Sequence, residues 1–191
     1  MRHDLYIFDV GGVICHGNDV LPEIADYLGT TPRGLVDAAG SLFRDLGTGR
    51  IGPDRFWKFL GPMFGTEINE DLWYTFFHPT IDACVIDLIS ELRSSGNRVV
   101  AGTNTVEGHY RYHLEHGEYE AFDRVYASHH IGAEKPDPAF YRAILDAEQV
   151  ESADVVFIDD RIENVAGAQR VGIRAVRFTS CDGLRHSLSA I

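Results

Sequence analysis

Cysteine is scarce in this sequence, and its few copies match no familiar spacing. The chain of 191 residues holds three cysteines, Cys15, Cys84 and Cys181. The odd number, and the absence of metal-ligand or redox spacing between any two of them, exclude a cysteine-based metal or redox motif. We therefore expect three buried free thiols in a reducing compartment, with the cytoplasm as the default location.

Long apolar runs and excess basic charge are lacking as well. No segment approaches the length of a membrane span, and the N-terminal residues MRHDLYIF carry charge without a cleavage-like region, so we expect no signal peptide. Lys and Arg number 17 against 29 Asp and Glu, a formal charge of −12. This acidity argues against nucleic acid or an anionic membrane as the main partner. A site for an anionic substrate must then be built locally, from a metal ion, a lysine or backbone amides.

The remaining composition is that of an ordinary globular protein, with 45% hydrophobic and 24% charged residues. Short apolar runs, most of them continuous rather than alternating, are typical of parallel strands that are covered on both faces. These runs span residues 5–8, 98–102, 154–158 and 174–178, with 124–128 as a weaker candidate. Helical patterns lie between them, at residues 82–95, 138–148 and 162–171. The alternation predicts a right-handed, doubly wound, Rossmann-like α/β core with a parallel sheet.

Residues 16–81 differ from the rest of the chain because they show helical periodicity without a convincing strand. Glycine and proline punctuate the joins between the helical stretches. We predict an inserted cap of about four helices at residues 16–81, and an α/β core made of residues 1–15 and 82–191. The alternative is one compact domain without a separate cap.

Polar side chains follow three of the predicted strands. They are Asp9, then Thr103 and Asn104, then Asp159 and Asp160. A lysine, Lys135, lies in the loop GAEKPDP just before a predicted helix. In a doubly wound sheet, ligands bind outside the carboxyl ends of the strands. We therefore expect these polar groups to meet in one site.

This set of residue types suits phosphoryl or acyl-type transfer through an aspartate. Asp9 can attack as a nucleophile and form a covalent aspartyl intermediate. Carboxylates packed together repel one another unless a cation lies among them, and an oxygen-rich site of this kind suits Mg²⁺. The Lys135 ammonium and the Thr103 hydroxyl can hold phosphate oxygens as charge spreads over them.

Four motifs, in this order, resemble those of the haloacid dehalogenase (HAD) superfamily. "FDVGGV" at residues 8–13 resembles the nucleophile motif, and "GTN" at 102–104 resembles the Ser/Thr motif at a strand end. "EKPDP" at 134–138 resembles the lysine motif, and "IDDRIEN" at 158–164 resembles the acidic metal motif. Each motif is weak alone, but the ordered set spans residues 5–178. It is most similar to small phosphatases that act on sugar phosphates and related monoesters, with a helical cap in the position of the family's first cap type.

The resemblance implies a metal site. Asp9 is expected to be both the nucleophile and a metal ligand, and Asp160 to be the second carboxylate ligand. Asp159 is expected to be a further ligand, either directly or through water. The backbone carbonyl of Gly11 is expected to bind the same ion, so Mg²⁺ is the implied cofactor.

The resemblance also implies a phosphate site. Thr103 and Lys135 are expected to bind the phosphoryl group, with Lys135 also screening the charge of Asp9. Asn104 is expected to supply a backbone or side-chain donor near the phosphate. Asn164 is expected to orient the acidic loop.

The sequence departs from the family pattern at Gly11, where most phosphatases of the family carry a second aspartate. That aspartate acts as general acid and base, which contributes about 10²–10⁴ in rate. Phosphoryl transfer depends mostly on positioning and on electrostatic stabilisation, so we expect a slower enzyme rather than an inactive one. Substrates with good leaving groups, such as a sugar anomeric phosphate or an acyl phosphate, lose least. Otherwise another residue must supply the proton, and His16 is the nearest candidate in the sequence.

These features predict a Mg²⁺-dependent phosphatase for a small phosphorylated metabolite, with sugar phosphates among the candidates. One alternative is a non-catalytic phosphate-ligand binder or regulatory protein whose site has lost turnover. A less favoured alternative is a metal-independent 2-haloacid dehalogenase, because dehalogenases of the superfamily also lack the second aspartate. The paired Asp159 and Asp160 favour the phosphatase. The substrate, the cap residues that select it and the oligomeric state are left open.

Several histidines invite a functional interpretation. His109, His113 and His116 have spacings that share one face of a helix, which suits either a transition-metal site or a wet surface helix. His129 and His130 come shortly before the lysine loop and are candidates for lining the cleft.

The cap holds further candidates. Its aromatic residues are expected to form mostly the core of the cap, with one or two facing the substrate. Arg50 and His78 are polar cap residues that can contact a leaving group.

Overall fold

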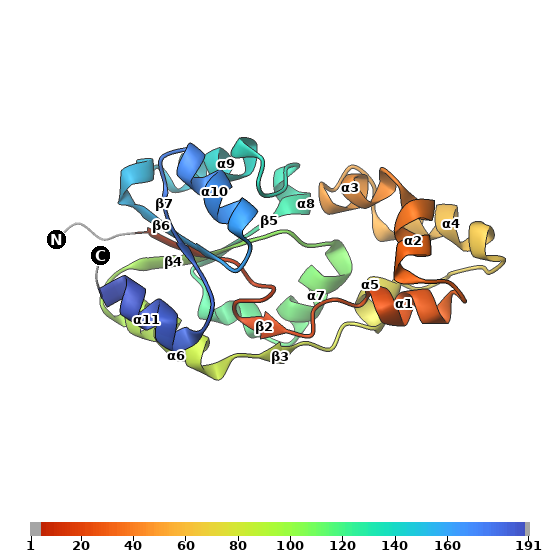
Figure 1. Ribbon diagram of the computed structural model, residues 1–191, viewed down its shortest axis with the longest axis horizontal. Coiled ribbons are helices and arrows are strands. Elements are labelled where there is room, and N and C mark those ends of the chain that lie inside the picture. Colours follow the sequence, from red (N-terminus) through yellow and green to blue (C-terminus); the bar gives the residue numbers. More distant parts are fainter. Residues whose placement is uncertain (1–4, 190–191) are drawn as a thin grey trace.

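Five parallel strands form a central sheet in the computed structural model, which describes residues 5–189. The strand order across the sheet is β5-β4-β1-β6-β7, so β1 is the middle strand (Figure 1). The strands are β1 (Leu5–Phe8), β4 (Arg98–Thr103), β5 (Arg124–Ala127), β6 (Val155–Asp159) and β7 (Arg174–Arg177). Each neighbouring pair is parallel. The predicted doubly wound α/β fold is confirmed, and the weaker candidate at 124–128 forms an edge strand.

Helices cover both faces of this sheet. One face packs against α6 (Ala83–Ser94) and α11 (Cys181–Ser189), and the other against α9 (Pro138–Glu148) and α10 (Ile162–Arg170). The remaining core elements are α7 (Glu107–Glu115), η2 (Glu118–Ala121), α8 (Ser128–Ile131) and η3 (Ser152–Asp154). Among residues 5–189, none of the helices is both long enough and apolar enough to cross a membrane.

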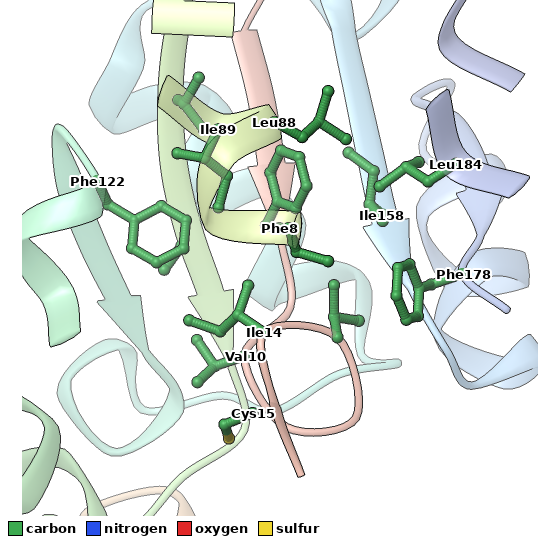
Figure 2. Packing of buried hydrophobic residues seen from close by; sticks show 14 of the residues in the cluster. Phe8, Val10, Ile14, Cys15, Leu88, Ile89, Phe122, Ile158, Phe178 and Leu184 are labelled. Carbon is green, nitrogen blue, oxygen red and sulfur yellow. The ribbon is translucent and has the colours of Figure 1, made fainter. Parts of the chain in front are cut away.

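The continuous apolar runs of the strands follow from this double cover. Successive residues of a strand point to opposite faces, so Val99 packs on the α6 side and Val100 on the α9 side. Figure 2 shows the α6 side, where Phe8 and Ile158 of neighbouring strands meet Leu88 of α6. Both faces are buried, and an alternating polar pattern would therefore place polar groups in the core.

Residues between β2 (Cys15–His16) and β3 (Thr80–Ile81) form a helical cap that extends from the core in Figure 1. Its helices are α1 (Leu21–Tyr27), α2 (Pro32–Ala39), α3 (Leu42–Gly47), α4 (Pro53–Leu60), η1 (Gly61–Phe64) and α5 (Leu72–Thr75). A separate apolar cluster, which includes the buried Phe56, Trp57 and Trp73, holds these helices together. The cap thus contains one more α-helix than the four expected.

A short antiparallel ribbon joins the cap to the core, and the expectation that residues 16–81 hold no strand is wrong at both ends. Cys15 pairs with Ile81, and His16 pairs with Thr80. Each strand has two residues, which is too short for a period of two to be recognised in the sequence.

The cap also contacts the core directly. Gly108 of α7 lies so close to the cap that an added Cβ would be 2.5 Å from Asp71 Oδ2. Elsewhere in the contact between cap and core, Ser128 Oγ donates to the Gly47 carbonyl at the end of α3, at 2.7 Å. These contacts fix the cap against the carboxyl side of the sheet.

The expectation of three free thiols is wrong. Cys84 at the start of α6 and Cys181 at the start of α11 form a disulfide, with Cα atoms 6.2 Å apart. The two residues are separated by 97 positions, so only the packing of both helices on one face of the sheet brings them together. Cys15 is the free cysteine and is buried; burial raises the pKa of its thiol to about 12.

The disulfide predicts the number of reactive thiols. In denaturant without reductant we expect one thiol per chain to react with Ellman's reagent, because only Cys15 is free. Reduction should raise the count to three and lower the free energy of unfolding by about 2–4 kcal/mol, since the cross-link closes a long loop. The double variant Cys84→Ser, Cys181→Ser is the control and should be insensitive to reductant. Three reactive thiols before reduction would contradict the assignment.

Candidate active site

The carboxyl ends of three adjacent strands bring Asp9, Thr103 and Asp159 to one edge of the sheet. Asp9 follows β1, Thr103 ends β4 and Asp159 ends β6, and β1 lies between the other two strands. The backbone N–H of Asp9 donates to the Ile158 carbonyl at 2.8 Å, which extends the pairing of β1 with β6 by one step. All three side chains are buried. Charged groups at this depth need partners.

Lys135 supplies the positive charge at this edge. Its Nζ lies 2.7 Å from Asp9 Oδ1 and 2.8 Å from Asp159 Oδ2, and its side chain is fully buried. Asn104 fixes the lysine backbone, because the Lys135 N–H donates to Asn104 Oδ1 at 2.8 Å and Asn104 Nδ2 donates to the Lys135 carbonyl at 2.9 Å. Both polar atoms of the Asn104 amide are therefore engaged by the lysine loop, and this side chain acts on the site through Lys135.

Asp159 is the most heavily hydrogen-bonded carboxylate of the site. Its Oδ1 accepts from the Arg161 backbone N–H at 2.9 Å, and Asn164 Nδ2 lies 3.0 Å from each of its two oxygens. Lys135 completes the set on Oδ2. These donors make Asp159 an anchor for the lysine and for the loop that follows β6.

Three carboxylates and one ammonium leave an excess of negative charge. Asp9, Asp159 and Asp160 each offer an oxygen within 4.8 Å of the others. Burial raises the pKa of Asp9 to about 7; the Lys135 charge opposes this shift and the Asp159 charge adds to it. Burial, and then the charge of Asp159, also raise the pKa of Asp160. The raised pKa values mean that the ionised site needs more positive charge than Lys135 provides.

The donor set fits a hard divalent cation. Asp160 Oδ1 is buried and has no hydrogen-bond partner among the described residues. Gly12 leaves room for this carboxylate, because its φ is 78° and a Cβ there would lie 2.5 Å from Asp160 Oδ2. Carboxylate and carbonyl oxygens are the ligands that Mg²⁺ takes. Asp9 and Asp160 therefore have the chemistry and the free oxygen atoms to hold such an ion.

The backbone conformation at position 11 does not require a glycine. Its φ lies outside the left-handed region, unlike that of Gly12. An added Cβ at Gly11 would lie 2.6 Å from Nδ2 of Asn18. Asn18 is exposed, so its side chain has room to rotate away. The fold therefore does not forbid a side chain at position 11, and the missing acid is a chemical feature of this site.

A cavity of about 410 Å³ lies between the cap and the core. Asn104 and Arg161 line its core side, and they directly follow Thr103 and Asp160 in the chain. Asn18, which covers Gly11, lines it as well. The cavity therefore adjoins the buried carboxylates and Lys135. A larger cavity of about 810 Å³ is lined by cap residues between 54 and 70 and contains none of the predicted site residues.

His16 lies apart from this cavity. Its Nε2 is 3.6 Å from Asp82 Oδ2, at the N-terminus of α6, and half of its side chain is exposed. The residues that line the 410 Å³ cavity do not include it. This placement gives no support to His16 as a substitute acid.

The three spaced histidines of α7 have separate partners. His109 stacks on Phe77 with ring centroids 3.8 Å apart, and burial lowers its pKa to about 3. His113 is buried against Glu118, and His116 Nδ1 lies 2.8 Å from the Tyr112 carbonyl. Among residues 5–189, they belong to no cluster of possible metal ligands, so the interpretation as a transition-metal site is wrong.

His109 lines the 410 Å³ cavity, but the remaining candidates in the lysine-loop region and the polar candidates of the cap do not. His129 and His130 line a separate cavity of about 240 Å³ at the seam between cap and core. Glu107 lies there with them, 3.1 Å from His129 Nε2. In the cap, Arg50 pairs with Asp45 at 3.4 Å, and the ring of His78 packs near that of Tyr112.

Sequence reasoning missed several residues of the cavity, among them Asn18 and Arg161. Arg161 lies inside the motif IDDRIEN, next to Asp160, so its position after a strand end was a usable signal. Asn18 is an exposed residue of an irregular segment. No periodicity or motif marks it, and only the path of the chain after β2 brings it over Gly11.

Comparison with known proteins adds independent information. The family model of the haloacid dehalogenase-like hydrolases matches residues 3–172. The chain is 32% identical over 190 residues to the sesquiterpene phosphatase astK of Aspergillus oryzae, an alignment that covers 91% of this chain and 88% of that protein. It is 25% identical over 203 residues to the D-ribitol-5-phosphate phosphatase of Bacteroides thetaiotaomicron, covering 97% and 96% of the two chains.

A solved structure has the same fold. It is a HAD family enzyme from Bacteroides thetaiotaomicron in complex with magnesium and inorganic phosphate. The TM-score is 0.77, and the superposition covers 93% of this chain and 94% of that one. Sequence identity is 22%, so this likeness speaks for the fold alone.

The excess of negative charge at the site predicts that the stabilisation of the fold by Mg²⁺ depends on pH. Because burial raises the pKa of Asp9 to about 7, the metal-free fold loses stability as the pH rises through that value. Mg²⁺ offsets this loss, whereas at lower pH the proton on Asp9 competes with the ion. We expect Mg²⁺ to raise the melting temperature more at about pH 8 than at about pH 5.5, measured by thermal denaturation with Mg²⁺ or EDTA.

Two variants separate this response from non-specific ion effects. Asp160→Asn should remove most of the Mg²⁺ shift near pH 8, because it loses a charged oxygen donor. Asp37→Asn, on the exposed surface of α2, should leave the shift unchanged. An equal shift at both pH values, or one that survives Asp160→Asn, is incompatible with the cation site.

Proposed function

The chain belongs to the haloacid dehalogenase-like hydrolases, and we propose that it is a Mg²⁺-dependent phosphatase that hydrolyses a small phosphomonoester through a covalent intermediate on Asp9. One observation carries the proposal. A fully buried lysine ammonium lies 2.7 Å from Asp9 and 2.8 Å from Asp159, beside a third carboxylate with an unpartnered oxygen. Burying such a group is costly, and phosphoryl transfer is a reaction that uses it.

Asp9 is proposed to attack through Oδ2. Its Oδ1 already accepts from the Val10 backbone N–H at 2.7 Å and contacts Lys135 Nζ, so Oδ2 is the less engaged oxygen. A lone pair of Oδ2 forms the new bond to phosphorus while the bond from phosphorus to the leaving oxygen breaks. Water then attacks the phosphorus of the aspartyl phosphate, which releases inorganic phosphate and regenerates the Asp9 carboxylate.

Lys135 and Thr103 are proposed to bind the transferring phosphoryl group. The lysine is held rigidly by its two carboxylate partners and by Asn104, so its charge is already oriented before the substrate arrives. Thr103 ends the neighbouring strand, and its hydroxyl is buried at the same edge. Bound Mg²⁺ supplies charge that neutralises phosphate oxygens. Asn164 keeps Asp159 in place for this arrangement.

The relatives support this reaction over the two alternatives. A sesquiterpene phosphatase and a D-ribitol-5-phosphate phosphatase both align over about nine-tenths or more of this chain. The Asp159–Asp160 pair argues against a metal-independent dehalogenase. A non-catalytic phosphate binder is distinguished from an enzyme by turnover.

Hydrolysis of 4-nitrophenyl phosphate tests the proposal. We expect turnover that requires Mg²⁺, stops with EDTA, and falls at least about 10³-fold in Asp9→Asn because the nucleophile is lost. The surface variant Asp37→Asn is the control and should retain the wild-type rate. Phosphate binding without turnover would instead identify a binding protein, and halide release from a 2-haloacid without metal would identify a dehalogenase. Activity that survives Asp9→Asn would assign a different nucleophile.

Placing an acid at position 11 tests whether the lack of a general acid there slows hydrolysis of substrates with poor leaving groups. Because the backbone accepts a side chain there and Asn18 can move away, we expect Gly11→Asp to fold and to speed hydrolysis of a simple alkyl phosphate about tenfold or more. The rate on 4-nitrophenyl phosphate, whose leaving group needs little protonation, should change far less. Gly11→Ala adds the same Cβ without an acid and serves as the matched control. Equal effects of Asp and Ala on both substrates would show that proton transfer does not limit this enzyme.

A further inference from the structure

We propose that the leaving group of this phosphatase is an apolar alcohol, and that the 410 Å³ cavity between the cap and the core binds its hydrocarbon part. The inference rests on the proposed function and concerns the substrate class that the same site accepts. It follows from the chemistry of the cavity wall and from the position of the polar residues at its floor.

The cap contributes a largely apolar wall. Its apolar lining side chains are Val20, Leu21, Phe43 and Trp73, and the charged residue Asp19 lies beside Val20 in the lining. Val20 and Trp73 belong to the buried cluster of the cap, and the rings of Phe43 and Trp73 lie edge to face with centroids 5.8 Å apart. This wall is therefore largely apolar and also held in shape by the core of the cap.

The facing part of α7 is uncharged. Val106 and His109 line the cavity on this side. Burial lowers the pKa of His109 to about 3, so its imidazole is neutral over the physiological pH range. Its ring stacks on Phe77 and cannot swing toward a bound ligand without losing that contact.

Polar residues gather on the floor of the cavity. Asn104 and Arg161 follow the proposed phosphate and metal residues in the chain, and Asn18 covers Gly11. Of the charged residues that line the cavity, Arg161 Nε donates to Glu163 at 2.8 Å and Glu134 lies 3.7 Å from Arg44. Asp19, which is also in the lining, accepts from the Leu21 backbone N–H at 3.1 Å. The cavity thus has polar residues next in the chain to the proposed phosphate and metal residues, and apolar side chains on the cap and at the start of α7.

This distribution fits the monophosphate of an apolar alcohol better than that of a polyol. A polyol hydroxyl placed against Val20, Phe43 or Val106 would find no side-chain hydrogen-bond partner there, and an unpartnered buried hydroxyl weakens binding. The side-chain oxygens of the lining come from other residues, among them Asp19, Thr105, Ser128 and Glu134. A hydrocarbon chain gains from the same wall by leaving water. The volume lies within the range of small-molecule sites and exceeds what the phosphate group needs.

A series of 4-alkylphenyl monophosphates, from methyl to octyl, tests the proposal. These substrates share nearly the same leaving-group acidity, so differences in kcat/KM report contacts of the chain rather than chemistry. We expect kcat/KM in the presence of Mg²⁺ to rise by up to about three- to fourfold for each methylene that the wall buries. An isoprenyl monophosphate should likewise exceed ribitol 5-phosphate by about 100-fold or more.

Two variants in the cavity wall and one control variant test whether the dependence of kcat/KM on chain length arises in this cavity. Val106→Asn makes the wall polar at the N-cap of α7, a position where asparagine is favoured, so the helix should be preserved. Leu21→Gln makes the same kind of change on the cap. Both should lower the ratio of kcat/KM for the octyl over the methyl substrate by about tenfold or more. Met63→Asn, on the exposed surface of the cap, should leave the ratio unchanged.

The outcomes separate this inference from the proposed function. Mg²⁺-dependent hydrolysis that does not depend on chain length, or that favours ribitol 5-phosphate, overturns the apolar leaving group and leaves the phosphatase intact. A chain-length effect that persists in both Val106→Asn and Leu21→Gln overturns the assignment to this cavity. Failure to hydrolyse any of the phosphates, including 4-nitrophenyl phosphate, overturns both.

Discussion

The contact of one buried ammonium with two buried carboxylates is the constraint on which the rest of the site depends. Lys135 without Asp9 and Asp159 would be an uncompensated charge in the core, and each aspartate needs the lysine for the same reason. Asn104 holds the lysine backbone and Asn164 holds Asp159. The polar network can therefore form only when β1, β4 and β6 have met in the correct register.

The two parts of the molecule divide the work between them. Parallel strands of the core deliver the reactive groups because their carboxyl ends meet at one edge of the sheet. The cap carries no residue of that network and instead supplies the apolar wall of Val20, Phe43 and Trp73. In the proposed function, the reactive groups come from the core and most of the apolar wall comes from the cap, so a change in the cap wall leaves Asp9 and Lys135 undisturbed.

The strands and the residues at their ends could be predicted from the sequence because neighbouring residues encode them. Contacts between segments far apart in the chain could not be predicted in this way. Continuous apolar runs identified the strands, and the polar residues at their ends identified the site that contains Asp9. The Cys84–Cys181 disulfide joins positions 97 residues apart, which no spacing rule connects. His109 was indistinguishable from a surface residue because helical spacing does not reveal that the cap covers α7. The two-residue ribbon strands were too short to show a pattern.

The disulfide has a topological consequence for the middle strand. The covalent loop between Cys84 and Cys181 contains β4, β5, β6 and β7, whereas β1 lies outside it in the chain. In the sheet, β1 pairs with β4 on one side and with β6 on the other. The strands of the closed loop therefore flank the position of β1 on both sides. The four residues of β1 complete the sheet there through hydrogen bonds and packing alone. Without that strand the two pairs of strands would have no direct contact within the sheet, and the closed loop that carries Lys135 and Asp159 would lack Asp9, the proposed nucleophile.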